Sequence, residues 1–144
     1  LAHWLRLLPL TVRPDARSIV VVGLGAGITL EDVPPSVREL YAIEIEPEVV
    51  AANAAQSGTR RVDPLADPRL RLLIDDARSA LQSTTRRFDL IVSQPSHPWT
   101  SGASHLFTQE FFALVASRLA EDGVFAQWIG LEYVDAELLR AMLA

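Results

Sequence analysis

Short apolar runs rich in β-branched residues recur along the chain and alternate with segments of helical periodicity. The first run, 19–22, reads Ile-Val-Val-Val and ends at glycines, which is typical of a strand buried on both faces of a parallel sheet. Further strands are predicted at 40–45, 70–74, 88–92 and 124–129. Helices are predicted at 47–56, 77–83 and 105–119, with a last helix from Asp135. Residues 1–17 are expected to be a lead-in: a short helix that ends near Pro9, followed by a polar turn.

This alternation of strands and helices predicts an α/β fold. We expect one Rossmann-like, doubly wound parallel sheet with strand order 3-2-1-4-5, covered by helices on both faces in three α/β/α layers. Ligands of such sheets bind outside the carboxyl ends of the strands, where the strand order reverses. The loops after the strands should therefore form one crevice, and residues 1–144 should form one nucleoside-binding domain.

The glycine-rich loop after the first strand is the strongest local motif. Gly23, Gly25 and Gly27 allow a tight turn and a close approach of the backbone to a ligand. Ile28 stands where a dinucleotide-binding motif would have a third small residue, so the pattern favours a nucleoside such as S-adenosylmethionine over NAD. The alternative is a strand-to-helix turn that binds nothing.

Acidic residues follow the next two strands. Glu44 lies about 20 residues after the glycine loop, where a carboxylate can accept hydrogen bonds from ribose hydroxyls. Asp76, or failing that Asp75, can accept a hydrogen bond from an exocyclic amine such as adenine N6, while one of the two caps the following helix. Glu46 and Glu48 are interpreted as surface residues of the helix after Glu44.

Composition narrows the function further. The chain of 144 residues is 49% hydrophobic and 22% charged, as in an ordinary globular domain, and its net charge of -5 argues against a nucleic-acid partner. Cysteine is absent, and the three histidines show no metal-ligand spacing, so no metal site is expected. The chain begins with Leu, which suggests a piece of a longer protein, and we expect a cytoplasmic location.

Several segments together resemble the spermidine synthases and related polyamine aminopropyltransferases, on the class I methyltransferase fold. The segments are Val-Val-Val-Gly-Leu-Gly-Ala-Gly, Ala-Ile-Glu-Ile-Glu-Pro-Glu-Val-Val, Ile-Asp-Asp-Ala-Arg, Phe-Asp-Leu-Ile-Val-Ser-Gln-Pro-Ser-His-Pro-Trp and Leu-Phe-Thr-Gln-Glu-Phe-Phe. The resemblance covers nearly the whole chain. It implies that the three glycines hold the nucleoside, that Glu44 binds the ribose, and that Asp76 with Ala77 lies at the adenine. Ser93 joins these cofactor-binding candidates from the end of the fourth strand.

The loop after the fourth strand departs from the family pattern. Where the family has an aspartate as base and a second acid for the diamine, this chain has Gln94 and His97. An amide can orient a substrate but takes up no proton near neutral pH, and a protonated His would repel a polyamine. Gln94 and His97 are therefore the candidate catalytic residues, with His97 either a base or a packing residue beside Pro98 and Trp99.

The first hypothesis is a spermidine synthase-like transferase that moves an aminopropyl group from decarboxylated S-adenosylmethionine to a polyamine and leaves methylthioadenosine. The alternatives are an S-adenosylmethionine-dependent methyltransferase, or an inactive ligand-binding domain of a larger membrane-associated protein. The resemblance also implies a homodimer and allows a fused membrane domain outside this chain.

Overall fold

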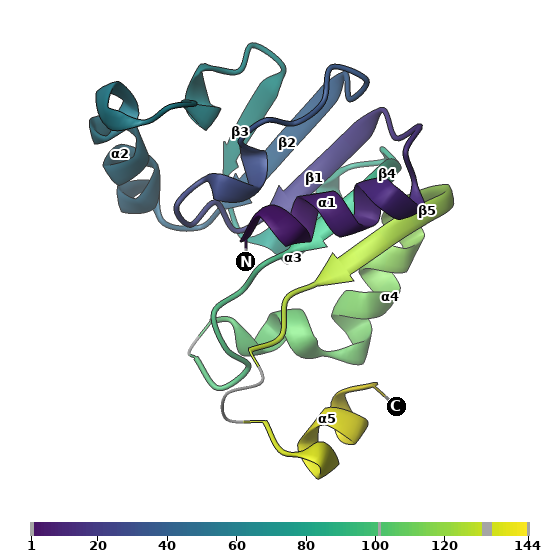
Figure 1. Ribbon diagram of the computed structural model, residues 1–144. Coiled ribbons are helices and arrows are strands. Elements are labelled where there is room, and N and C mark those ends of the chain that lie inside the picture. Colours follow the sequence, from purple (N-terminus) through teal and green to yellow (C-terminus); the bar gives the residue numbers. More distant parts are fainter. Residues whose placement is uncertain (1, 101, 131–133, 144) are drawn as a thin grey trace.

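A five-stranded parallel sheet forms the centre of the computed structural model, which describes residues 2–100, 102–130 and 134–143 (Figure 1). The strands lie in the order β3-β2-β1-β4-β5, which confirms the predicted topology. Their bounds are β1 Ser18–Val22, β2 Glu39–Glu44, β3 Leu70–Ile74, β4 Phe88–Ser93 and β5 Leu119–Gln127. β1 is at the centre and pairs with both β2 and β4. The strand order reverses beside β1, and ligands of such sheets bind outside the carboxyl ends of the strands at this position.

Helices cover both faces of this sheet. One face carries α1 Ala2–Val12, the short 3-10 helix η1 Ile28–Leu30 and α2 Pro47–Ala55, and the other carries α3 Ala77–Ser83 and α4 Gln109–Arg118 (Figure 1). Short 3-10 helices η2 Ser57–Thr59, η3 Pro64–Ala66 and η4 Ser104–Phe107 lie in the connections. The last helix, α5 Ala136–Leu143, lies apart from the sheet (Figure 1). None of the helices in the described part of the chain has the length and apolar character needed to cross a bilayer.

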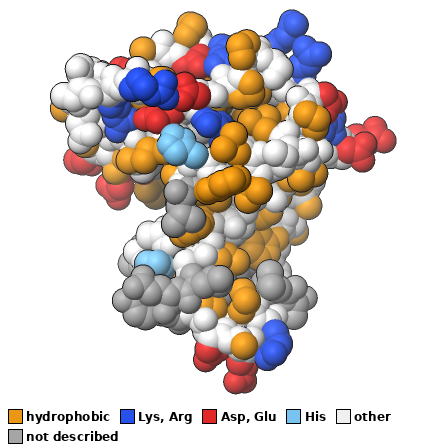
Figure 2. Space-filling view, viewed as in Figure 1, with side chains coloured by type: hydrophobic (Ala, Val, Ile, Leu, Met, Phe, Trp, Pro, Cys, Tyr) orange, Lys and Arg blue, Asp and Glu red, His pale blue; other side chains and the backbone are white. Residues whose placement is uncertain are grey.

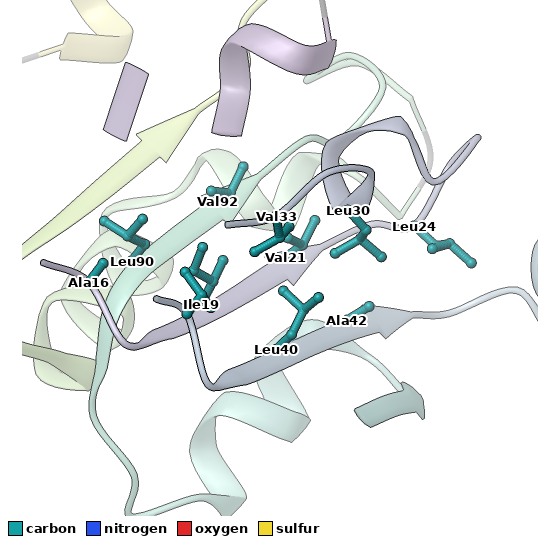
Figure 3. Close-up of a cluster of buried hydrophobic side chains, with 11 residues drawn as sticks. Ala16, Ile19, Val21, Leu24, Leu30, Val33, Leu40, Ala42, Leu90 and Val92 are labelled. Atoms are coloured by element: carbon teal, nitrogen blue, oxygen red, sulfur yellow. The ribbon is translucent and has the colours of Figure 1, made fainter. Parts of the chain in front are cut away.

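Alternating residues of the central strands fill the two cores. Ile19 and Val21 of β1 face the α1 side, where they pack with Leu40 and Ala42 of β2 and Leu90 of β4 (Figure 3). The intervening β1 residues, Val20 and Val22, face α3 and α4 and pack with Phe111 and Val115 of α4. All five residues of β1 are buried, as its unbroken β-branched run predicts.

Three predicted boundaries are wrong. α1 does not end near Pro9 but runs through it to Val12. Leu5 and Leu10 pack on the core of the sheet and Pro9 is buried, so packing outweighs the hydrogen bond that proline cannot donate. The single helix predicted for 105–119 is divided into η4 and α4 at Thr108, whose hydroxyl caps α4 by accepting a hydrogen bond from the Phe111 amide.

The third correction concerns β5, which begins at Leu119 rather than Val124. Leu119 already pairs with Phe88, and the register then shifts before Val124 pairs with Leu90. Asp122, with a φ of 57°, lies within this irregularity, so the backbone is distorted inside the strand.

The outer side of α1 remains apolar. Trp4, Leu8 and Val12 follow one another at intervals of one helical turn and are all exposed, and hydrophobic side chains gather over α1 and β5 in Figure 2. α1 therefore presents apolar side chains to solvent, while its buried residues include the charged Arg6 as well as Pro9.

Asp89 ties the start of β1 to β4. Its Oδ2 accepts hydrogen bonds from the amides of Arg17 at 2.7 Å and Ser18 at 3.0 Å, and from the Ser18 hydroxyl at 3.1 Å. Burial by itself would raise the pKa of Asp89, but these hydrogen bonds and the nearby Arg13 guanidinium bring that pKa below its ordinary value.

We predict that Asp89→Asn lowers the free energy of unfolding by about 1–3 kcal/mol at pH 7, because the amide is a weaker acceptor than the carboxylate. The pKa of the Asp89 carboxyl is lower in the folded chain than in the unfolded chain. The stabilisation by the Asp89 carboxylate is therefore complete above the unfolded-state pKa of about 3.9 and is lost as the pH falls through the folded-state pKa. Urea unfolding of both proteins should show the full difference at pH 7 and a smaller one below about pH 4. An equal difference at both pH values would contradict this role.

Candidate functional site

The carboxyl ends of the strands surround a cavity of about 540 Å³. Seven of the predicted site residues line it: Gly23, Gly25, Glu44, Asp75, Asp76, Ala77 and Gln94. These residues come from the ends of β1, β2, β3 and β4 and the start of α3, so the sheet topology brings them together from distant parts of the sequence. Gly27, Ser93 and His97 are not among the residues that line this cavity.

The glycine loop adopts a backbone that side chains would oppose. Gly23 has a φ of 86°, and a Cβ there would lie 3.3 Å from the carbonyl oxygen of Gln94. Gly27 has a φ of 74°, and a Cβ there would lie 2.8 Å from Cγ of Pro64. The missing side chain at Gly27 therefore lets the loop pack closely against η3, although Gly27 does not line the cavity.

Glu44 is a buried carboxylate directed at this loop. Only 7% of the residue is exposed, and Oε2 accepts hydrogen bonds from the amides of Leu24 at 2.8 Å and Gly25 at 3.4 Å. Oε1 accepts one from the Glu46 amide at 3.0 Å. Each carboxylate oxygen has two lone pairs, so Oε1 retains acceptor capacity toward the cavity.

Asp75 and Asp76 are arranged by the start of α3. Asp76 caps the helix by accepting a hydrogen bond from the Ser79 amide at 3.0 Å, as one member of the pair was expected to do. Asp75 accepts one from the Asp76 amide at 2.8 Å, and its own amide donates to the carbonyl of Glu44. Both carboxylates line the cavity, and Ala77 lies beside them.

The cavity is acidic. Glu46, which was interpreted only as a surface residue, occupies the N-cap position of α2 without a capping hydrogen bond from its side chain. It joins Glu44, Asp75 and Asp76 in the lining, whereas none of the described lining residues is basic. Such a lining attracts a cation. No group of three or more His, Asp or Glu side chains that could hold a metal ion occurs in the part of the chain that the structure describes.

Gln94 turns its side chain toward the glycine loop. Its Nε2 donates hydrogen bonds to the carbonyls of Gly23 at 2.5 Å and Leu24 at 3.3 Å, and its Oε1 accepts one from the Thr29 hydroxyl at 2.6 Å. Gln94 also lines a second cavity, of about 300 Å³, between α1 and the loop. The amide thus lies between two cavities with its polar atoms bonded to protein groups.

Ser93 and His97 lie away from the main cavity. Ser93 is fully buried, and its hydroxyl has no hydrogen-bond partner among the described residues. The His97 ring stacks on Trp99 with centroids 4.9 Å apart, which fits the packing alternative for His97. Trp99 itself is 52% exposed.

Asn53 and Ile45 are site residues that the sequence interpretation missed. Asn53 is buried, and its Nδ2 donates hydrogen bonds to the carbonyls of Gly25 at 2.7 Å and Val49 at 2.8 Å. The sequence could have indicated Asn53 because this polar residue lies four positions after Val49, and therefore on the same side of α2, which packs on the sheet. Ile45, which directly follows Glu44, is exposed and supplies an apolar wall of the main cavity.

Comparison with known proteins decides the family. The model of the spermine/spermidine synthase domain matches residues 3–138, which is most of the chain. The chain belongs to the spermine/spermidine synthase family. The resemblance described above is therefore confirmed.

Individual relatives agree with this assignment, and a more distant structure shares the fold. The polyamine aminopropyltransferase of Synechococcus sp. (strain JA-2-3B'a(2-13)) is 38% identical over 112 residues, covering 76% of this chain and 36% of that protein. A spermidine synthase crystallised with the transition state analogue AdoDATO is 27% identical with a TM-score of 0.79, over 88% of this chain and 43% of that one. Human methyltransferase-like protein 13, solved with SAH, has a TM-score of 0.67 at 22% identity, over 99% of this chain and 66% of that one, and shares the fold. The chain thus spans less than half the length of this polyamine aminopropyltransferase and of this spermidine synthase.

We predict that Gly27→Ala is more destabilising than Gly25→Ala. Both positions have positive φ, which costs an alanine about 1–2 kcal/mol. Only Gly27 adds a steric conflict with Pro64, because no atom lies within 4 Å of a Cβ at Gly25. Urea unfolding should show an additional loss of about 1–3 kcal/mol for Gly27→Ala, and equal losses would contradict the observed packing.

Proposed function

We propose that the cavity at the strand ends binds the adenosyl moiety of an S-adenosylmethionine-type donor and that the domain transfers a group from this donor. The first candidate is aminopropyl transfer from decarboxylated S-adenosylmethionine to a polyamine, leaving methylthioadenosine. One observation carries the proposal: Glu44, a buried carboxylate at the end of β2, faces the glycine loop within a cavity of about 540 Å³. That volume lies in the range of small-molecule sites.

The residues around the cavity fit an adenosine. Glu44 would accept hydrogen bonds from the ribose hydroxyls, since Oε1 retains acceptor capacity. Asp76 or Asp75 would accept one from the adenine amine. Ile45 and Leu106 would provide apolar walls for the ring.

The charge of the cavity supports a cationic donor. Four carboxylates line it, and a sulfonium nucleoside carries a positive charge that these groups would stabilise. The relatives point to the same ligand class, because one is named a polyamine aminopropyltransferase and another was crystallised with AdoDATO.

The chemistry needs an acceptor and a route for a proton. The bound donor supplies an electrophilic carbon beside its sulfur, and the carbon–sulfur bond breaks with its electron pair on sulfur as the acceptor nitrogen attacks. Gln94 cannot take up the proton that the amine then releases. The ionisable groups in the cavity lining are the four carboxylates, so the proton would pass to one of them or to water.

The position of Gln94 also favours a second candidate, a ligand-binding domain without turnover. Both polar atoms of its side chain are hydrogen-bonded to the glycine loop and Thr29, which leaves the usual base position without a carboxylate. Methyl transfer from S-adenosylmethionine is the third candidate. The products separate these activities.

We predict saturable binding of methylthioadenosine in isothermal titration, weakened at least about 30-fold by Glu44→Ala, because hydrogen bonds to a charged group are lost. Glu48→Ala is the matched control, since Glu48 is an exposed residue of α2 outside the cavity lining, and it should bind as the wild type does. Unfolding midpoints of all three proteins show whether the fold is retained. Absence of binding in the wild type, or equal affinity in Glu44→Ala, would refute the nucleoside site.

Turnover is tested on the same protein with two donors. Release of methylthioadenosine from decarboxylated S-adenosylmethionine with putrescine is the expected result and identifies aminopropyl transfer. Release of S-adenosylhomocysteine from S-adenosylmethionine would identify methyl transfer instead. Tight binding with neither product would identify the ligand-binding domain.

A further inference from the structure

The peptide group between Gly23 and Leu24 connects two side chains on opposite sides of the glycine loop. Its carbonyl accepts the hydrogen bond from Nε2 of Gln94 at 2.5 Å, and its N–H donates to Oε2 of Glu44 at 2.8 Å. The carbonyl and the N–H of a planar trans peptide point in opposite directions, so one rigid unit joins the two side chains.

The following peptide repeats this connection with longer hydrogen bonds. The Leu24 carbonyl accepts from Gln94 at 3.3 Å, and the Gly25 amide donates to Glu44 at 3.4 Å. Two successive peptides of the loop therefore lie between the amide of Gln94, which directly follows β4, and the carboxylate of Glu44 at the end of β2.

The two loop carbonyls fix the orientation of this amide, and Thr29 binds its other end. Thr29 is 2% exposed, and its hydroxyl donates to Oε1 of Gln94 at 2.6 Å. The two loop carbonyls can only accept, so the NH2 group of Gln94 must face them. A series of hydrogen bonds therefore runs from Thr29 through Gln94 and the 23–24 peptide to Glu44, and such bonds polarise one another.

We propose that Gln94 is a positioning residue that places the Glu44 carboxylate for the nucleoside ribose through the 23–24 peptide. This inference rests on the proposed function, because it assigns the ribose to Glu44. It also explains why an amide suits this position: a carboxylate there would direct lone pairs at two carbonyl oxygens.

The test compares two ligands that differ only at the ribose. Methylthioadenosine carries both ribose hydroxyls, and its 2′,3′-dideoxy analogue carries neither. The wild type should bind methylthioadenosine at least about tenfold more tightly than the analogue, whereas Glu44→Ala should hardly distinguish them. The quantity compared is the ratio of the affinity for methylthioadenosine to the affinity for the dideoxy analogue. Gln94→Met retains the length of the side chain without its hydrogen bonds, and its affinity ratio should fall to within about threefold of the Glu44→Ala ratio.

Asn53→Ala is the matched control. Asn53 holds the same loop at the Gly25 carbonyl, which belongs to a peptide that makes no hydrogen bond with Glu44. Loosening the loop there should weaken both ligands by similar factors and leave the ratio near the wild-type value. If Gln94→Met does not fold, Thr29→Val frees the same amide and should lower the ratio in the same direction.

The outcomes separate this inference from the proposed function. If Gln94→Met weakens both ligands equally and retains the wild-type ratio, Gln94 serves only the general structure of the loop and the inference is overturned. A wild type that binds methylthioadenosine without preferring it over the dideoxy analogue overturns the assignment of the ribose to Glu44. A wild type that does not bind methylthioadenosine overturns the proposed function itself.

Discussion

A buried carboxylate must be hydrogen-bonded, and Glu44 meets this requirement with the amides of the glycine loop. The positive φ angles of Gly23, Gly25 and Gly27 shape the loop whose Leu24 and Gly25 amides reach Oε2. The loop in turn determines where the walls of the cavity lie. The geometry of the whole site thus depends on one interaction between the ends of β1 and β2.

The sheet makes this interaction possible because neighbouring parallel strands end at the same edge. β1 has β2 on one side and β4 on the other, so side chains from both neighbours reach the loop that follows it. Glu44 approaches from β2 and Gln94 from the end of β4, and α2 adds Asn53. Family membership accounts for this architecture, and Gln94 and His97 are the two positions at which this chain departs from the expected catalytic pattern.

Strong local patterns predicted most of the fold. The run 19–22 ends at glycines, and its unbroken hydrophobicity indicated a strand buried on both faces, as β1 is. The strand order and α3 also agree with the prediction. The errors arose where tertiary contacts outweigh local signals: α1 continues through Pro9 because it packs on the sheet, and β5 starts early because Leu119 pairs with Phe88. Similarly, no sequence pattern shows that the Gln94 side chain turns toward the loop, since this depends on Thr29 and two backbone carbonyls.

The most direct test of the nucleoside site is a crystal structure of this chain with methylthioadenosine. The account predicts adenosine in the cavity at the strand ends, with both ribose hydroxyls within hydrogen-bond distance of Glu44 and the adenine amine near Asp75 or Asp76. The Gln94 amide should remain on the Gly23 carbonyl. Methylthioadenosine bound elsewhere, or bound in this cavity with its ribose away from Glu44, would contradict the account.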